Sequence, residues 1–384
     1  MINEAVKGFN DYTGQEARKR RKIKEIIENI FELYGFQPAE TPVIEYEEFV
    51  RGENQQDETI SDIFKLQDKG KRNLALRYEF TFQLKRISQN KKLPFKRYQI
   101  GPVFRDEPVS ANRFRQFTQC DIDIVGSSLK DEAEILAMSS KILKELGIKV
   151  VINVNNRKLL NEIMEEQKIK EKDAVMREID KIDKLSEGEV KKNLKKYKAE
   201  KLIEIFKKPK SFFKKYPAFA EIEELEKNCR IYGIKINFQS SLARGLSYYN
   251  GTIFEIKTKE MKETICSGGS YSVNGINSTG ISFGIERLSV LSKTKPESRE
   301  VLVISINEDK KAIAIAEELR KSNIPCTIMF GKISKALEFA NSYSIPYTVF
   351  VGKLELAKKK LKLRDMKTGS EKLLSEKQII ESLK

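Results

Sequence analysis

The chain has 384 residues, with 72 Lys and Arg against 56 Asp and Glu, so its formal net charge is +16 at pH 7. A chain of this length exceeds one ordinary domain and predicts about two or three. The positive excess favours a polyanionic partner such as nucleic acid, although a lysine-rich solvated surface would give the same total. No apolar run reaches the roughly 20 residues of a membrane span, and the N-terminus lacks a signal-peptide core, which predicts a cytoplasmic protein with no membrane partner.

The composition excludes several classes of active site, because the chain contains no histidine. Ser-His-Asp sites, Cys-His sites and histidine metal ligation are ruled out, and the usual general base at neutral pH is missing. Any catalysis must therefore rest on arginines, carboxylates, positioning and bound ions. The cysteines are far apart and predict buried small residues instead of zinc ligands or disulfides; they are Cys120, Cys229, Cys266 and Cys326.

The N-terminal segment predicts a long amphipathic helix over residues 14–34, since apolar residues recur there at helical intervals. Thr13 and Glu16 have the spacing of a capping box at its start. Residues 37–46 are then expected to be extended, with two prolines typical of an edge strand. A helix followed by such a strand indicates a dimer surface or, equally, a surface helix that covers one sheet.

The segment 73–81, NLALRYEFT, carries a carboxylate and a hydroxyl two residues apart after an apolar run. If the segment is extended, Glu79 and Thr81 point the same way. Such a pair could hold an ammonium group, because the carboxylate supplies charge and the hydroxyl supplies an oriented acceptor. A helix through Leu84 and Ile87 is expected to follow.

The stretch 101–123 predicts a hairpin, with two extended halves joined near residues 108–112. A packed sheet does not normally place several polar side chains on one face unless water, a ligand or a catalytic pocket lies against it. The alternative is a solvated, salt-bridged hairpin. Alternation puts four polar residues on one face: Arg115, Gln119, Asp121 and Asp123.

The two ends of this predicted turn add further charged groups. Arg105 and Glu107 come just before it and Arg113 follows it. Guanidinium forks suit phosphate oxygens, and a neighbouring carboxylate can accept from a donor.

A helix over 131–146 and a strand over 150–154 are expected next, followed by a change of composition. Residues 156–230 are rich in lysine and glutamate, predict helices, and have the character of an insertion. Its lysine run at 191–198 could meet a phosphate backbone, but a charge run is more often a solvated face.

Residues 240–256, SSLARGLSYYNGTIFEI, return to strand character. Arg244 precedes a glycine, and buried tyrosines such as Tyr248 and Tyr249 usually need a partner for the hydroxyl. The Asn-Gly pair at 250–251 is a strong turn signal.

The segment 266–271, CSGGSY, has paired glycines where a backbone can approach a ligand closely. A helix is predicted over 281–292, carrying Glu286 and Arg287. Glycines followed by a helix are by themselves a weak phosphate signal.

A linker over 293–299 precedes a change to alternating apolar strands and amphipathic helices, which predicts a small α/β domain. This region contains no obvious catalytic set, so binding is its expected activity. The expected strands are 301–306, 325–330, 347–351 and 360–365, and the expected helices are 310–321, 332–344 and one at the C-terminus.

Several ordered segments resemble motifs of the class II aminoacyl-tRNA synthetases. FRDE with RFRQFTQCDID resembles motif 2, ISFGIERL resembles motif 3, and the first helix with its proline-containing strand resembles motif 1, the dimer element. LARGLSYYNGTIFE and SGGSY resemble the two signature segments of the histidyl-tRNA synthetase family, and LALRYEFT resembles its amino-group-binding segment. Residues 301–384, including KLRDMKTG, are similar to its anticodon-binding domain.

The resemblance implies an α+β fold with an antiparallel-sheet class II catalytic domain, formed by residues 1–155 and 231–293 and active as a homodimer. Residues 156–230 would be a helical insertion domain, and residues 300–384 an α/β anticodon-binding domain.

The activity implied is that of a ligase. It would activate histidine with ATP to histidyl-adenylate and transfer the acyl group to the 3′-terminal adenosine of tRNA(His), with Mg²⁺ accompanying ATP. No direct motif marks a metal site. A histidyl-tRNA synthetase-like regulatory paralogue and a catalytically inactive tRNA-binding protein are the alternatives.

The resemblance also implies roles at the ATP end of the site. Arg105 would hold the α-phosphate and Glu107 the adenine side. Arg113 and Arg287 would hold the outer phosphates with magnesium.

At the amino-acid end, the resemblance assigns the amino group of histidine to Glu79, Thr81 and Gln119. Asp123 would accept from the imidazole. The ring would be enclosed by Tyr248, Tyr249 and Tyr271.

Arg244 would lie by the carboxylate and the α-phosphate, where it stabilises charge during the attack. Ser247 departs from the commoner family pattern, which has aspartate there. Arg115 and Asp121 receive no role, beyond a mutual salt bridge or a tRNA contact.

Overall fold

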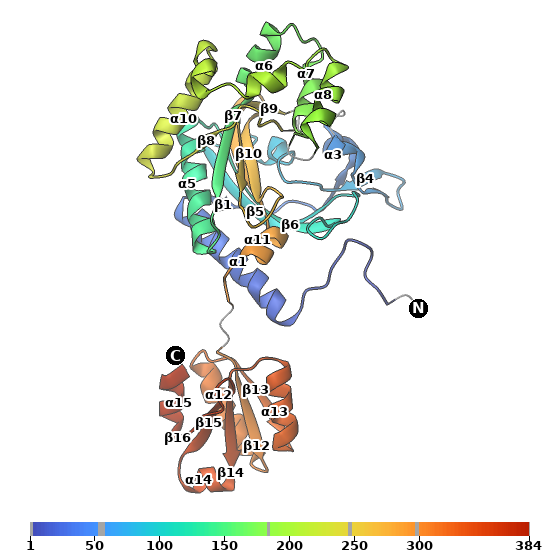
Figure 1. The fold of residues 1–384 in the computed structure, drawn as a ribbon. Coiled ribbons are helices and arrows are strands. Elements are labelled where there is room, and N and C mark those ends of the chain that lie inside the picture. The colour runs from blue at the N-terminus through green and yellow to red at the C-terminus, as the bar shows by residue number, and fades with distance from the viewer. Residues whose placement is uncertain (1–2, 53–57, 183–184, 245–247, 296–298, 384) are drawn as a thin grey trace. The chain divides into compact units, whose positions relative to one another are not determined.

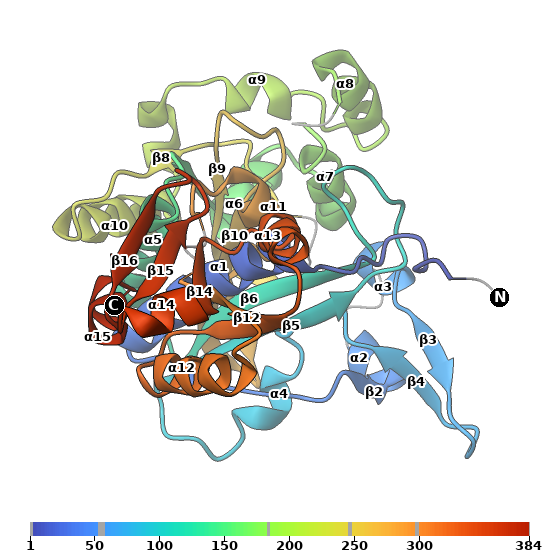
Figure 2. The same cartoon turned by 90° about the horizontal axis from the view of Figure 1, so that it is seen from below.

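The computed structural model describes residues 3–52, 58–182, 185–244, 248–295 and 299–383, so the Ser247 departure lies outside the described residues. The chain divides into two compact units, Met1–Thr294 and Lys295–Lys384. Figure 1 and Figure 2 show the elements of each. None of the helices in the described part of the chain combines the length and the apolar character that a membrane span requires.

The N-terminal unit is built on an eight-stranded sheet in the order β1-β5-β6-β11-β10-β9-β7-β8. The six central strands pair antiparallel, whereas the two short edge strands are parallel to their neighbours. The strands are β1 (Gln37–Pro38), β5 (Phe95–Phe104), β6 (Gln116–Val125), β7 (Val151–Asn156), β8 (Asn237–Phe238), β9 (Tyr249–Lys257), β10 (Cys266–Val273) and β11 (Ile276–Gly284).

Helices α1 (Gly14–Leu33) and α5 (Leu129–Glu145) bury one face of this sheet. On α1, Ile23, Ile27 and Phe31 recur at helical spacing and pack into the same apolar core as Ile122 of β6. Because side chains alternate along a strand, this packing leaves the other face of β6 for a site. The capping box expected at the start of α1 does not form, since the Thr13 side chain makes no capping hydrogen bond.

A three-stranded sheet in the order β2-β4-β3 lies beside the predicted ammonium-binding segment. The expected extended run over 73–81 is shorter than predicted, because the strand ends at Leu76 and the chain then turns toward α4. The elements here are β2 (Ile44–Tyr46), α2 (Glu47–Arg51), α3 (Glu58–Ser61), β3 (Lys65–Gln67), β4 (Asn73–Leu76) and α4 (Leu84–Ile87).

The lysine-rich segment after β7 is helical, as its composition predicted. Its last helix packs along α5, and the others gather near the end of the sheet formed by β7 and β9 (Figure 1). The helices are α6 (Arg157–Glu166), α7 (Lys172–Ile179), α8 (Glu187–Lys195), α9 (Leu202–Phe206), the 3₁₀ helix η1 (Lys210–Lys215) and α10 (Phe219–Ile231).

Two local predictions in the second half of this unit are wrong. The Asn-Gly pair at 250–251 lies inside β9, at the point where the register between β9 and β10 shifts, and the pairing with β7 begins only at Thr252. The strand continues through this irregularity, where Gly251 faces Ser270 at close range. The helix predicted from residue 281 begins only at Ile285, as α11 (Ile285–Leu291), since residues 281–284 complete the pairing of β11 with β6.

The paired glycines of the 266–271 segment also serve the sheet. A β-carbon on Gly268 would lie 2.7 Å from the Phe254 ring, and one on Gly269 would lie 2.9 Å from the Tyr249 ring. The neighbouring backbone is closer still, with the Gly280 carbonyl oxygen at 2.0 Å and the Thr252 carbonyl oxygen at 2.4 Å. These glycines therefore serve close packing against neighbouring strands, whereas the sequence predicted close approach of a ligand.

The C-terminal unit is an α/β domain with a five-stranded sheet in the order β13-β12-β14-β15-β16. Alternating residues of β12 face two apolar cores, one with α12 and α15 and the other with α13. The sequence missed α14 and β16. The elements are β12 (Val301–Ile306), α12 (Asp309–Lys321), β13 (Cys326–Phe330), α13 (Ile333–Ser342), β14 (Tyr347–Gly352), α14 (Lys353–Ala357), β15 (Leu361–Asp365), β16 (Glu371–Leu374) and α15 (Glu376–Leu383).

Candidate functional site

A cavity of about 580 Å³ lies against the face of the sheet that α1 and α5 leave open. Its walls come from β6, β9, β10, β11, the β5–β6 connection, the segment after β4 and the end of α7. All twelve residues singled out from the sequence line it: Glu79, Thr81, Arg105, Glu107, Arg113, Gln119, Asp123, Arg244, Tyr248, Tyr249, Tyr271 and Arg287.

Side chains of β6 alternate between the two faces of the sheet, and its polar side chains line this cavity. Gln119, Asp121 and Asp123 line the cavity, while Cys120 and Ile122 are buried in the core behind it. Gly280 of β11 pairs with Asp123, and a β-carbon there would collide with the Asp123 carboxylate. Glycine at this position therefore keeps the carboxylate accessible from the cavity.

Arg115 does not share this face, contrary to the alternation predicted from the sequence. It precedes the first residue of β6, and its guanidinium lies 3.1 Å from the Asp106 carboxylate. The mutual salt bridge considered for Arg115 and Asp121 is absent, because Asp121 is buried in the cavity floor.

The Asp123 carboxylate is held between two buried groups. Arg97 of β5, only 1% exposed, places Nη2 at 2.6 Å from Asp123 Oδ2 and also donates to the Phe80 carbonyl at 3.1 Å. The Tyr271 hydroxyl donates to Asp123 Oδ1. Burial raises the pKa of Asp123, and the Arg97 charge and the Tyr271 hydrogen bond oppose that rise.

Arg97 is a site residue that the sequence did not reveal. Only the register of β5 against β6 would have revealed it. In that pairing Arg97 lies directly opposite Asp123 and shares its face. That register depends on a connection of irregular chain between the two strands, which alternation within either strand does not specify.

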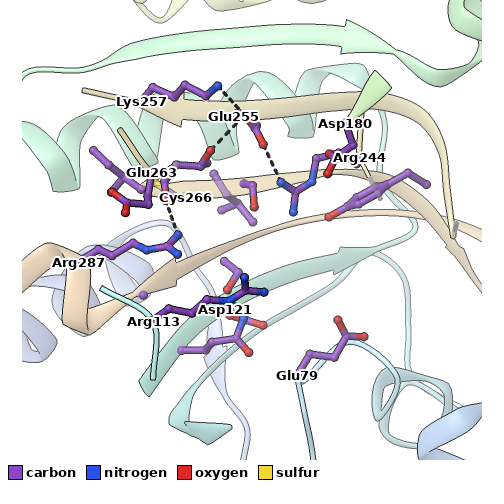
Figure 3. Close-up of a pocket in the computed structure, with 18 of the residues that line it drawn as sticks. Glu79, Arg113, Asp121, Asp180, Arg244, Glu255, Lys257, Glu263, Cys266 and Arg287 are labelled. Atoms are coloured by element: carbon purple, nitrogen blue, oxygen red, sulfur yellow. Dashed lines mark hydrogen bonds and ion pairs between the residues drawn. The ribbon is translucent and has the colours of Figure 1, made fainter. Parts of the chain in front are cut away.

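Three tyrosines form an aromatic wall beside Asp123. The ring centroids of Tyr248 and Tyr249 are 4.7 Å apart, and Tyr248 meets Tyr271 edge-on at 5.5 Å. Glu79 points its carboxylate into the cavity (Figure 3) and is 5% exposed. Burial raises the pKa of Tyr248 well above its ordinary value, and the Glu79 charge adds to the effect.

Arg244 projects into the cavity from the segment before β9. Its Nη1 donates to Glu255 Oε1 at 2.7 Å, and Glu255 also accepts from Thr264 at 3.2 Å. Burial acts to lower the pKa of Arg244, but Glu255, Tyr249 and Asp180 together outweigh it and raise that pKa above its ordinary value. Asp180, which follows α7, lies on the same wall (Figure 3).

Neither Glu255 nor Asp180 was predicted from the sequence. Asp180 comes to Arg244 from the end of α7, far away in the chain, whereas Glu255 lies on β9, the strand that follows Arg244.

The remaining arginines gather at another side of the cavity. Arg287 Nη1 donates to the Thr264 carbonyl at 2.6 Å, and Arg113 pairs with Glu107. Burial lowers the pKa of Arg287, and the nearby Arg113 and Arg105 charges lower it further. Closely placed guanidinium groups repel one another, so this side of the cavity is suited to an anion.

The helix α11 is anchored so that Arg287 reaches this group. The preceding Glu286 accepts from the Thr118 amide at 3.1 Å and from Arg20 Nη2 of α1 at 2.7 Å. Glu286 thus ties the start of α11 to β6 and α1, while Arg287 turns to the cavity.

Within the described residues, no group of three or more Cys, Asp or Glu side chains forms a metal-ligand cluster. Glu107 and Glu263 line the cavity near Arg287, where their charges oppose the lowering of the Arg287 pKa by burial. Mg²⁺ is commonly held by one or two carboxylates together with substrate phosphates, and these residues fit that arrangement.

Family models match both units. The model described as histidyl-tRNA synthetase matches residues 8–288, and the model described as anticodon binding domain matches residues 300–384. A Bacillus cereus protein named histidine–tRNA ligase 1 is 37% identical, and the alignment covers 97% of this chain and 95% of the relative. A Wolinella succinogenes protein named histidine–tRNA ligase is 34% identical over 96% of this chain and 94% of its own length.

Solved structures agree in fold. The histidyl-tRNA synthetase from Nostoc sp. PCC 7120 has a TM-score of 0.86 at 26% identity, and the match covers 100% of this chain and 99% of that one. A Bacillus halodurans protein described as an ATP phosphoribosyltransferase regulatory subunit/histidyl-tRNA synthetase has a TM-score of 0.76 at 18% identity, covering 88% and 96%. The second match shows the fold alone.

Proposed function

Because the chain belongs to the histidyl-tRNA synthetase family, we propose that its cavity activates histidine with ATP and that the enzyme then charges tRNA(His). The family resemblance and the α+β fold class predicted from the sequence are confirmed by these matches. The regulatory alternative is not favoured, since nearly the whole chain aligns with proteins named histidine–tRNA ligase.

One observation supports the activity most strongly: guanidinium groups gather toward one side of the cavity, away from the Glu79 carboxylate. Arg113 and Arg287 lie toward one side and Glu79 toward the other (Figure 3). A nucleoside triphosphate needs the first environment, and an ammonium group needs the second.

At the amino-acid side, Glu79, Thr81 and Gln119 bind the histidine ammonium, and Asp123 accepts a hydrogen bond from the imidazole. The Arg97 charge favours the ionised form of Asp123, which is the better acceptor. Among the three tyrosines, Tyr271 reaches the same carboxylate and therefore orders the imidazole acceptor directly. Tyr248 and Tyr249 enclose the ring.

At the ATP side, Arg105 holds the α-phosphate, Glu107 faces the adenine, and Arg113 and Arg287 hold the outer phosphates. Glu263, which lies near Arg287, would hold Mg²⁺ together with the phosphates. When bound, Mg²⁺ neutralises phosphate charge as pyrophosphate departs.

In the first step a carboxylate oxygen of histidine attacks the α-phosphorus, the bond to the bridging oxygen breaks, and pyrophosphate leaves. Arg244 and Arg105 stabilise the charge that develops between the two substrates. The nucleophile is already ionised at neutral pH, so no protein base is required. A chain without histidine can therefore perform this step by positioning and electrostatics alone.

In the second step a ribose hydroxyl of the terminal adenosine of tRNA(His) attacks the acyl carbon and AMP leaves. Residues 300–384 bind the anticodon arm, in keeping with the family model that matches them. Residues 1–155 and 231–293 form the catalytic domain, residues 156–230 form the insertion, and the enzyme acts in the cytoplasm.

The active form is a homodimer. The edge strand β2 exposes Ile44 and Tyr46 by 50% and 56%, and the neighbouring Val43 is also exposed. Apolar side chains gathered on a sheet edge favour burial against a second copy.

The direct test is pyrophosphate exchange driven in turn by each of the common amino acids. Histidine should support the fastest exchange, and the same preparation should charge tRNA(His). Absence of exchange with histidine, or faster exchange with another amino acid, contradicts the assignment. An inactive tRNA-binding protein would instead bind tRNA with a steep salt dependence and form no adenylate.

A further inference from the structure

Asp121 lies on the cavity floor and has no part in the function described above. It is 4% exposed and sits between Gln119 and Asp123 on the same face of β6. In the register of the sheet it lies directly opposite Ser282 of β11. Burying a carboxylate costs free energy unless it is hydrogen-bonded, so its place calls for a compensating interaction.

That interaction is a chain of side-chain hydrogen bonds. Asp121 accepts a hydrogen bond from Ser282, and Ser282 Oγ lies 2.6 Å from Gln119 Nε2. A serine hydroxyl has a single proton, and an ionised carboxylate can only accept. The Ser282 hydroxyl therefore donates its one hydrogen bond to Asp121. It can then only accept a hydrogen bond from the Gln119 amide.

The orientation of the Gln119 amide follows from this donor count. With Nε2 committed to Ser282, the amide oxygen is turned away from β11. Gln119 is 7% exposed, lines the cavity, and its Oε1 has no hydrogen-bond partner among the residues that the structure describes. A buried acceptor without a protein partner needs a donor, and the ammonium of a ligand in the cavity can supply one.

We propose that Asp121 is a positioning residue which, through Ser282, fixes the Gln119 amide so that its oxygen accepts from the histidine ammonium. This inference rests on the proposed function, which assigns Gln119 to that group. Without Asp121, the Ser282 hydroxyl is free to donate to Gln119 Oε1. The Gln119 amide can then rotate so that its NH₂ group faces the histidine ammonium. Both groups are hydrogen-bond donors, so no hydrogen bond forms between them.

The ionisation of Asp121 controls this chain. Its neighbours are Asp123 on the same strand, Arg97 on β5 and Arg105 just after β5. Burial is the main cause that raises the pKa of Asp121 to about 7; Asp123 adds to it, and the two arginines oppose it. Protonated Asp121 can donate to Ser282, so the orientation of the amide is lost below about that pH.

The test compares the wild type with Asp121→Ala and Ser282→Ala in histidine-dependent pyrophosphate exchange. Each variant should raise the KM for histidine about tenfold, the scale of a lost hydrogen bond to a charged group, and leave the KM for ATP within about twofold. The double variant should lose no more than either single one, because both changes break the same chain.

A ligand without an ammonium separates positioning from general damage to the cavity. 3-(Imidazol-4-yl)propionate should inhibit the wild type and both variants with the same Ki within about twofold, since it presents nothing to Gln119. In the wild type the KM for histidine should rise as the pH falls below about 7, and Asp121→Ala should lose that component.

Glu132→Gln is the matched control. Glu132 is also a buried carboxylate that accepts from a serine, Ser270, but it does not line the cavity. Its replacement should leave the KM for histidine unchanged.

Three results would overturn the inference: an unchanged KM in Asp121→Ala, equal losses for histidine and the propionate, or additive effects in the double variant. If the wild type itself shows no exchange with histidine, the proposed function fails instead.

Discussion

Replacing Arg97 by methionine tests how the imidazole-binding carboxylate is kept charged. Arg97 is 1% exposed and supplies the ion pair of Asp123 at 2.6 Å. Removing one partner of a buried pair leaves an uncompensated charge and typically costs about 3–5 kcal/mol. We expect Arg97→Met to lower the free energy of unfolding of the N-terminal unit by about that amount at pH 7.

The same substitution should weaken histidine binding. Burial already raises the pKa of Asp123, and without Arg97 that pKa rises further, which favours the protonated carboxyl group. A protonated Asp123 is a poorer acceptor for the imidazole. The KM for histidine in pyrophosphate exchange should therefore increase much more than the KM for ATP.

A second variant separates the lost charge pair from lost packing. Arg97→Met combined with Asp123→Asn removes both charges and keeps a side chain that can still accept from Tyr271. Because no buried charge is then left unpaired, the double variant should regain much of the stability lost by the single one, while histidine activation stays impaired.

Guanidinium unfolding monitored for the N-terminal unit gives the stabilities, with Lys96→Met as the control. Lys96 is the preceding residue of β5 and pairs with Glu134 at 2.5 Å in a partly exposed position, so its loss should cost at most about 1 kcal/mol. The reasoning is refuted if Arg97→Met is as stable as the control, or if the double variant is no more stable than Arg97→Met.

Three further predictions concern other parts of the site and core. Burial raises the pKa of Glu132 from 4.5 to about 7, so its contribution to stability is complete below the lower value and is lost as the pH rises through the upper one. In thermal unfolding, the free energy of unfolding of Glu132→Gln relative to the wild type should therefore increase by about 1–3 kcal/mol from pH 5 to pH 8. The same relative stability at both pH values would contradict this expectation. Arg244→Ala should abolish most histidine-dependent pyrophosphate exchange without changing the sedimentation of the protein, and normal exchange would remove Arg244 from the mechanism. Gly280→Ala should raise the KM for histidine, because the added methyl group collides with the Asp123 carboxylate. Calorimetric titration with histidine measures the affinity directly, and an unaltered affinity would contradict this reasoning.

The alternation of polar and apolar side chains in β6 was sufficient to predict its two faces. Gln119, Asp121 and Asp123 line the cavity, while Ile122 enters the core, as a period of two requires. The long helix α1 was equally predictable from its apolar spacing. The twelve candidate residues came from recognisable local motifs, and each of them lies on the cavity wall.

The partners of those residues were not predictable in the same way. Arg97 meets Asp123, and Ser282 meets Asp121, only through the pairing of strands. Each of these contacts depends on register between separate parts of the chain, which neither composition nor periodicity specifies.

The wrong local predictions have the same origin. Residues 250–251 carry a turn signal, yet they lie within β9 at an irregularity of its pairing with β10. The pairing of the flanking residues Tyr249 and Thr252 with neighbouring strands outweighs the turn propensity of two residues. By itself, the sequence determined the order of elements, the polar face of β6 and the kind of chemistry open to a chain without histidine. The tertiary structure alone decided which buried charge faces which partner, because those pairs form only when distant strands come into register.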